Sequence, residues 1–218
     1  RIEALNKWLK KETGILVAPV QALRRFLPPI EYWKNYELIF TTGEEINLEA
    51  TLKMLIHMGY ESTSMVTKPG EFSRRGGIID IYPITEEYPI RIELFDVEVD
   101  SIRYFDAESQ RSLEEQIQSV IIGPASELLL TEEDIYTAAE RLEEALSLSL
   151  KKVKESKDKE ALMEVIEQDI SRLKNLERFQ EMYKYIGYFY EEPESLIDYL
   201  PANGVIILDE MSRIEETA

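Results

Sequence analysis

The pair Asp209-Glu210 is the strongest candidate for catalytic chemistry, because it follows an uninterrupted apolar run at residues 204–208. Such a run predicts a buried strand, and an Asp-Glu pair at its end is typical of enzymes that place Mg²⁺ and a water beside a nucleotide. These enzymes also need a phosphate loop, G-x-x-x-x-G-K-[ST]. The closest start is Gly70, but arginine occupies position 75, where the second glycine would stand. The sequence therefore predicts a degenerate nucleotide-binding fold without ATP hydrolysis.

Other catalytic and metal-binding patterns are missing from the sequence. Cysteine is absent and His57 is the only histidine, which excludes disulfides, cysteine nucleophiles and cysteine- or histidine-rich metal sites. Neither G-x-S-x-G nor H-E-x-x-H occurs. Acidic pairs such as Glu86-Glu87 and Glu114-Glu115 lie in turn-like contexts and are interpreted as solvated surface. We expect no catalytic residue, no metal and no cofactor in this chain.

Residues 90–95 indicate a surface for binding a partner, because the two faces of this predicted strand differ in polarity. One face holds Ile90, Ile92 and Leu94, and the other holds Arg91, Glu93 and Phe95. An exposed phenylalanine near an arginine is typical of an interface hot spot. Arg74 and Arg75 add two cations to an otherwise acidic region. The pattern fits an alternative equally well, in which Phe95 turns inward at a bulge and the arginines form local ion pairs.

Charge and composition limit the partners. The 218 residues carry 43 acidic and 25 basic side chains, a net charge of −18, and 44% are hydrophobic, which predicts a soluble globular protein. Such a charge repels phosphates, so we expect no appreciable DNA binding by this chain. No apolar run approaches the ~20 residues of a membrane span. The absence of cysteine fits a reducing compartment, so we expect a cytoplasmic location.

The elements that position these residues predict an α/β fold with an α+β insertion. Two unalternating apolar runs, 14–20 and 204–210, indicate strands of one parallel sheet buried on both faces. Between them, residues 32–124 show period-two patterns and predict a small domain with an antiparallel sheet. Its helix would be capped by Asn47 and end at Gly59. Residues 1–31 and 125–218 would flank it.

The last third of the chain is expected to be mainly helical. A capping box at residues 131–134 opens one helix, and a second helical pattern runs from about Asp158 to Tyr190. The charged stretch 151–159 between them is interpreted as a solvated bend. Because the chain opens at Arg1 inside a predicted helix, we expect a piece of a larger protein.

Three segments carry a resemblance to a known family. GEFSRRGGIIDIYP (70–83), YPIRIELFDVEVDSIRYFD (88–106) and SQRS (109–112) resemble the UvrB-homologous module of bacterial transcription-repair coupling factors (Mfd). The helicase UvrB shares the shorter patterns F-x-x-R-G-x-x-[IL]-D-[IL]-[FY]-P and I-R-[IL]-E-x-F. Residues 15–29, 195–201 and 208–210 extend the resemblance over essentially the whole chain. The QRS form and the lack of a tyrosine-rich hairpin favour the coupling factors.

The resemblance implies a binding module rather than an enzyme. Residues 32–124 would dock onto the damage sensor UvrA through Arg75, Arg91 and Phe95, recruiting it to lesion-stalled RNA polymerase. Residues 1–31 and 125–218 would belong to a degenerate RecA-like domain without nucleotide hydrolysis. The parent would be a bacterial, cytoplasmic, ATP-dependent DNA translocase whose RNA polymerase and DNA contacts lie outside this chain, which we expect to be monomeric.

Two other functions remain open on the sequence. The chain could be part of the UvrB helicase, and a phosphate loop in the preceding sequence would favour that alternative. It could also be an acidic scaffold domain with no specific partner.

Overall fold

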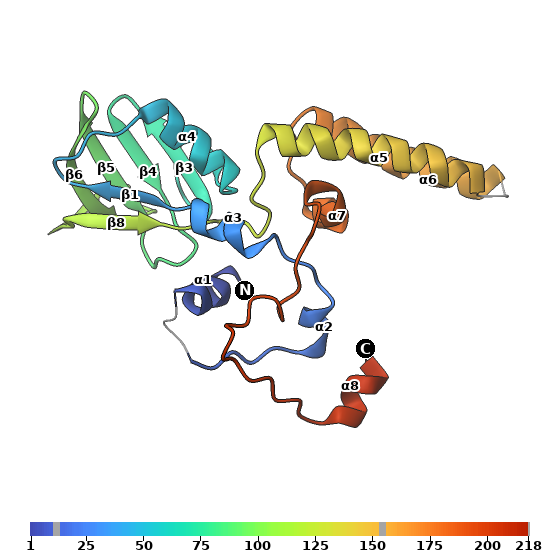
Figure 1. Ribbon diagram of the computed structural model, residues 1–218. Helices are drawn as coiled ribbons and strands as arrows, with labels where there is room; N and C mark the ends of the chain where they lie inside the picture. Colours follow the sequence, from blue (N-terminus) through green and yellow to red (C-terminus); the bar gives the residue numbers. More distant parts are fainter. Residues whose placement is uncertain (11–13, 153–155, 218) are drawn as a thin grey trace. The chain divides into compact units, whose positions relative to one another are not determined.

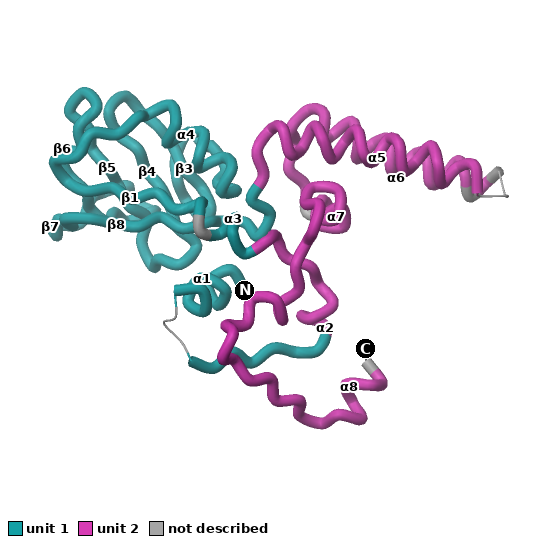
Figure 2. The backbone as a smooth tube through the Cα atoms, in the orientation of Figure 1, with its two compact units in different colours: residues 1–20, 30–129 teal, residues 21–29, 130–218 magenta. Residues whose placement is uncertain are grey.

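The computed structural model describes residues 1–10, 14–152 and 156–217, and its chain forms two compact units (Figure 2). Unit 1 contains residues 1–20 and 30–129, and unit 2 contains residues 21–29 and 130–218. The predicted insertion, 32–124, falls inside unit 1. That unit also includes residues 1–20, which were expected to belong to the flanking domain.

A six-stranded sheet dominates unit 1, as the period-two pattern predicted. Its strand order is β2-β3-β4-β5-β6-β7, with all neighbours antiparallel except β2 and β3. The strands are β2 (Glu61–Ser62), β3 (Glu71–Arg75), β4 (Ile78–Ile81), β5 (Ile90–Phe95), β6 (Glu98–Phe105) and β7 (Ser112–Gln116). The antiparallel sheet predicted for the insertion is thereby confirmed.

Smaller elements complete unit 1. Strands β1 (Leu38–Thr41) and β8 (Ser119–Ile122) pair as a two-stranded sheet, and the helices are α1 (Ile2–Leu9), α3 (Ile30–Asn35) and α4 (Leu48–His57). The side chain of Asn47 accepts a hydrogen bond from the backbone nitrogen of Ala50 at 3.0 Å, which confirms it as the N-cap of α4. Gly59, with φ of 91°, follows the end of that helix as predicted.

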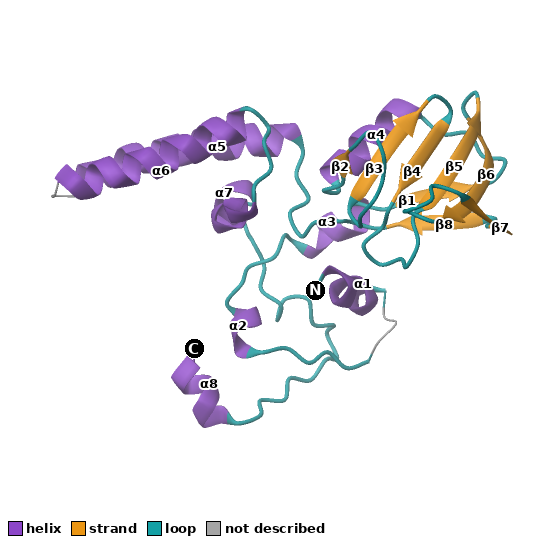
Figure 3. Cartoon of the chain, turned by 180° about the vertical axis from the view of Figure 1, so that it is seen from behind, coloured by secondary structure: helices purple, strands orange, loops and turns teal. Residues whose placement is uncertain are grey.

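The six-stranded sheet has an apolar inner face and a polar outer face. Helix α4 lies against the inner face (Figures 1 and 3), where Leu55, Ile79, Ile92 and Ile102 are completely buried. The outer face carries a row of cross-strand partners, listed from β3 to β7: Ser73, Asp80, Arg91, Arg103 and Gln116. Residues directly opposite each other in neighbouring strands share a face, so this row defines the outer surface.

Unit 2 is largely helical. Its elements are α2 (Val20–Leu23, which begins on the last residue of unit 1), α5 (Glu132–Lys152), α6 (Ser156–Lys174), the 3₁₀ helix η1 (Gln180–Tyr185), α7 (Ile186–Phe189) and α8 (Met211–Thr217). The capping box is confirmed by two hydrogen bonds. The backbone nitrogen of Thr131 donates to Asp134 Oδ2 at 2.7 Å, and the backbone nitrogen of Asp134 donates to Thr131 Oγ1 at 3.1 Å. The centre of the predicted bend, 153–155, lies outside the described residues.

The second long helix is shorter than its apolar pattern predicted. Helix α6 ends at Lys174, and Leu176 adopts a positive φ of 57° that breaks the helical path. The chain continues through η1 and α7 before Tyr190. The prediction of one helix from about Asp158 to Tyr190 is therefore wrong, because spacing alone does not reveal a change of direction.

The two expected parallel strands are not formed. Residues 15–19 and 204–209 have no strand assignment, and Val17 and Ile207 are 90% and 86% exposed. An apolar strand of this kind is stable only with strands beside it and layers over both faces. Neither run has a strand neighbour within the described residues, so the predicted RecA-like parallel sheet is absent from this structure.

A buried carboxylate holds the end of α6 to η1. Asp169 accepts a hydrogen bond from the Tyr185 hydroxyl at 2.6 Å. It also forms an ion pair with Lys184, whose Nζ lies 2.5 Å from Asp169 Oδ2. Burial acts to raise the pKa of Asp169, but hydrogen bonds from Lys184 and Tyr185 outweigh it and leave the pKa lowered. The ionised form therefore stabilises unit 2.

We expect Asp169→Asn to reduce the free energy of unfolding by about 1–3 kcal/mol at pH 7. Because a lowered folded-state pKa contributes stability above the unfolded value, the difference from wild type should shrink as pH falls below about 4. Urea denaturation across this pH range measures it. Glu164→Gln, an exposed change on the same helix, is the control. An effect of Asp169→Asn that is independent of pH would contradict the charge-based explanation.

Candidate partner-binding site

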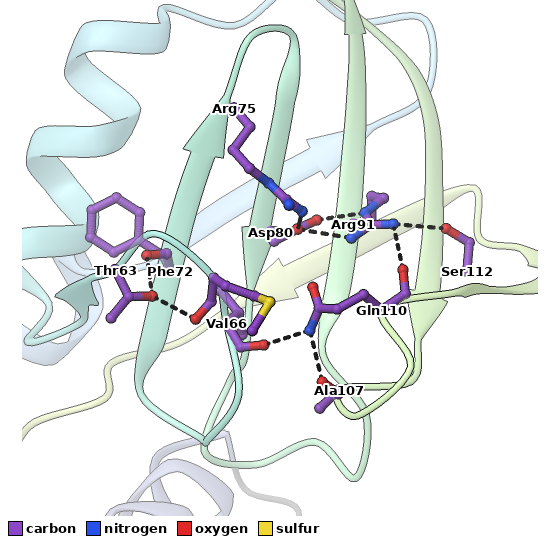
Figure 4. Close-up of polar contacts among 10 residues, drawn as sticks. Thr63, Val66, Phe72, Arg75, Asp80, Arg91, Ala107, Gln110 and Ser112 are labelled. Carbon is purple, nitrogen blue, oxygen red and sulfur yellow. Dashed lines mark hydrogen bonds and ion pairs between the residues drawn. The ribbon is translucent and has the colours of Figure 1, made fainter.

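The centre of the candidate site is a completely buried aspartate that holds two arginines on the outer face (Figure 4). Asp80 stands opposite Arg91 in the β4–β5 register. Its Oδ1 lies 2.7 Å from Arg91 Nε and its Oδ2 lies 2.9 Å from Arg91 Nη2. This two-point pairing fixes the plane of the guanidinium group. The Arg91 hydrogen bond to Asp80 raises the pKa of Arg91, which keeps it charged.

Arg75 reaches the same carboxylate from the end of β3. Its Nη2 lies 2.8 Å from Asp80 Oδ2, while its side chain remains 47% exposed. The turn Gly76-Gly77 brings the β3–β4 hairpin close to β5, since a Cβ on Gly77 would lie 2.8 Å from the carbonyl oxygen of Leu94. A glycine is therefore required at position 77 for this approach.

Arg91 is held on its remaining sides as well. Its Nη1 donates to the carbonyl oxygen of Gln110 at 3.1 Å and lies 3.5 Å from Ser112 Oγ. Its guanidinium carbon lies 4.5 Å from the centre of the Phe105 ring, a cation–π distance. Only 11% of the Arg91 side chain is exposed. Arg91 thus presents one edge of a fixed cation rather than a mobile side chain.

Two loops support this arrangement. Gln110, with φ of 61°, donates from Nε2 to the carbonyl oxygens of Val66 at 2.9 Å and Ala107 at 2.7 Å (Figure 4). The carboxylate of Glu71 accepts from the backbone nitrogens of residues 67 and 68 at 2.8 and 3.0 Å. Burial acts to raise the pKa of Glu71, but these hydrogen bonds lower it overall. The loops 63–68 and 106–111 are therefore tied to each other and to β3.

Phe95 stands at the open end of β5. Its side chain is 77% exposed, and Asp96 turns the chain into β6 with φ of 59°. The strand alternation of β5 places Phe95 on the same face as Arg91. The alternative in which Phe95 turns inward is therefore wrong, although its local ion pairs are present. We call the surface formed by Arg75, Arg91 and Phe95 the docking face.

Sequence reasoning missed the residues that hold the docking face together. Asp80 lies within the motif at residues 70–83, but its pairing with Arg75 and Arg91, which we call the clamp, was not predicted. A signal existed: an aspartate between isoleucines in Ile-Ile-Asp-Ile (78–81) places a charge in an apolar strand, and such a charge needs a partner. The backbone contact from Gln110 depends on a loop conformation and left no signal in the sequence.

The residues considered for nucleotide chemistry do not form a site. The run before Asp209 is not a strand, and Glu210 pairs with Arg213 at 2.8 Å. Across residues 1–10, 14–152 and 156–217, no group of three or more acidic or histidine side chains could hold a metal ion. No helix in the described part of the chain is long and apolar enough to cross a membrane. The expectation of no cofactor stays a prediction.

Comparison with known protein families identifies the part of the chain that carries the docking face. The UvrB interaction domain family matches residues 38–128, which include Arg75, Arg91 and Phe95. The chain is thus an α+β module that contains a UvrB interaction domain.

Similarity extends over the whole chain in named relatives. It is 49% identical over 216 residues to the transcription-repair-coupling factor of Bacillus subtilis (strain 168), covering 99% of this chain. It is 38% identical to that of Staphylococcus epidermidis and 39% identical to that of Staphylococcus aureus (strain MRSA252), each over all of this chain. The chain therefore corresponds along its whole length to one segment of the transcription-repair-coupling factors. It spans 18% of the length of each of these relatives.

Proposed function

We propose that this chain is a non-catalytic module that recruits the repair protein UvrA to RNA polymerase stalled at a lesion. Arg75, Arg91 and Phe95 would contact UvrA directly. Contacts with RNA polymerase and DNA would be made by other parts of the whole protein, in the bacterial cytoplasm. The chain itself would act as a monomer.

The observation that carries this proposal is an exposed phenylalanine beside a rigid pair of arginines, inside the region matched by the UvrB interaction domain. Aromatic and arginine side chains dominate interface hot spots, because they bury large areas and form directional hydrogen bonds. Preorganisation by Asp80 reduces the entropy lost when a partner binds. The coupling factor names of the relatives support this reading over a fragment of UvrB.

Calorimetric titration of the chain into UvrA tests the proposal. We expect saturable binding with one chain per UvrA subunit. A folded chain that gives no heat and no shift in sedimentation with UvrA would contradict it, and would leave the scaffold alternative.

The same proposal predicts that the chain neither binds nor hydrolyses Mg·ATP. Asp209 and Glu210 have no phosphate loop and do not follow a strand. Calorimetry with Mg·ATP and a phosphate-release assay measure this. Saturable nucleotide binding that Asp209→Ala abolishes would show that a nucleotide site had been overlooked.

A further inference from the structure

Arg103 lies next to the docking face but has no role in the clamp. It is the cross-strand partner of Arg91 in the β5–β6 register, so both side chains are on the outer face. Its other neighbour in the row is Gln116 on β7, which carries no charge. Two arginines directly opposite each other repel, and nothing in the sheet itself requires a cation at position 103.

Arg103 contains an unpaired polar atom. Within the described part of the chain its guanidinium has no ion-pair partner, and its Nε is buried without an acceptor. Asp80, by contrast, neutralises one of the two charges of Arg75 and Arg91. Leaving a buried donor unpaired costs stability, and this occurs in a chain with 43 acidic side chains. Nε itself is out of reach of another molecule, so a partner carboxylate would pair with the terminal nitrogens of this half-buried side chain.

We propose that Arg103 is a fourth contact residue of the docking face and supplies much of its long-range attraction to carboxylates on the partner. A guanidinium fork pairs with a carboxylate at two points, and an uncompensated cation acts over a longer distance than a neutralised one. The inference rests on the proposed UvrA binding and adds that the UvrA surface facing β6 is acidic. Phosphates are the weaker alternative, because the chain's net charge of −18 repels nucleic acid.

The test compares two charge-neutralising changes, Arg103→Gln and Arg74→Gln. Arg74 stands opposite Ile79, so it is on the inner side of β3 at the sheet's margin, and it serves as the matched control. Affinity for UvrA is measured at several salt concentrations between about 50 and 500 mM, together with association rates.

We expect Arg103→Gln to weaken binding by about three- to fivefold at low salt, mainly through slower association, with the difference fading at high salt. Arg74→Gln should leave affinity unchanged. The thermal midpoint of Arg103→Gln should equal or exceed that of wild type, because an unpaired cation is removed beside Arg91.

Each of the following outcomes would overturn the inference. Equal effects of the two changes would mean that only net charge matters, and a lowered thermal midpoint of Arg103→Gln would show a structural role. Duplex DNA binding by wild type that Arg103→Gln abolishes would assign Arg103 to phosphates. If Phe95→Ala weakens UvrA binding but Arg103→Gln does not, only this inference fails; if wild type does not bind UvrA, both it and the proposed function fail.

Discussion

Replacing Phe95 with alanine is expected to weaken UvrA binding by about thirtyfold or more, with the fold unchanged. The side chain is 77% exposed, so the free chain loses little packing when the ring is removed. A bound partner would lose the apolar contact that Phe95 contributes to the docking face. Isothermal titration gives the affinity, and circular dichroism with a thermal scan confirms folding.

Substitutions of the docking-face arginines should also weaken UvrA binding, by an amount that depends on the replacement. Arg75→Ala and Arg91→Ala should each weaken binding, and Arg91→Glu should weaken it further, because it adds repulsion to the lost contact. Ile92→Ala is the control on the inner face. Its fully buried side chain should cost about 2–5 kcal/mol of folding stability when truncated.

Two results would refute this assignment. If Phe95→Ala unfolds unit 1 while Ile92→Ala has no effect, the two faces of β5 have been exchanged. If Phe95→Ala and both arginine changes leave UvrA binding intact in folded protein, the docking face lies elsewhere.

Asp80→Ala is expected to destabilise the chain by about 3–5 kcal/mol, because it leaves Arg91 buried without its counter-charge. The carboxylate is completely buried and pairs with both Arg75 and Arg91. UvrA binding should also fall, since the two guanidinium groups lose their fixed orientation. Urea denaturation measures the first effect and titration at a temperature well below the unfolding transition measures the second.

A double-mutant cycle separates the ion pair from simple loss of packing. Asp80→Asn with Arg91→Gln should be less destabilising than the sum of the two single changes, because the double variant leaves no unpaired buried charge. Strict additivity would mean that the two residues stabilise the sheet independently, and the clamp would then have no energetic basis.

Local patterns in the sequence were sufficient for the inner face of β5 and for the ends of α4 in unit 1. Alternation in residues 90–95 correctly placed Ile92 in the core, because neighbouring strand residues point to opposite faces, but it left the exposure of Phe95 open until the structure showed it. Asn47 and Gly59 marked the ends of α4, since capping depends on a few adjacent residues. The motifs also placed Arg75, Arg91 and Phe95 in one family pattern.

Long-range contacts decided the rest. The runs at 14–20 and 204–210 read as buried strands, but a strand exists only when its neighbours are present, and in this chain both runs are exposed. Arg91 read as an exposed contact residue, yet Asp80 from β4 and Gln110 from a distant loop enclose it. The sequence determined which residue types are on the docking face. Only the tertiary structure determined that a single buried carboxylate orients two of them, because that pairing joins three strands whose register no local pattern encodes.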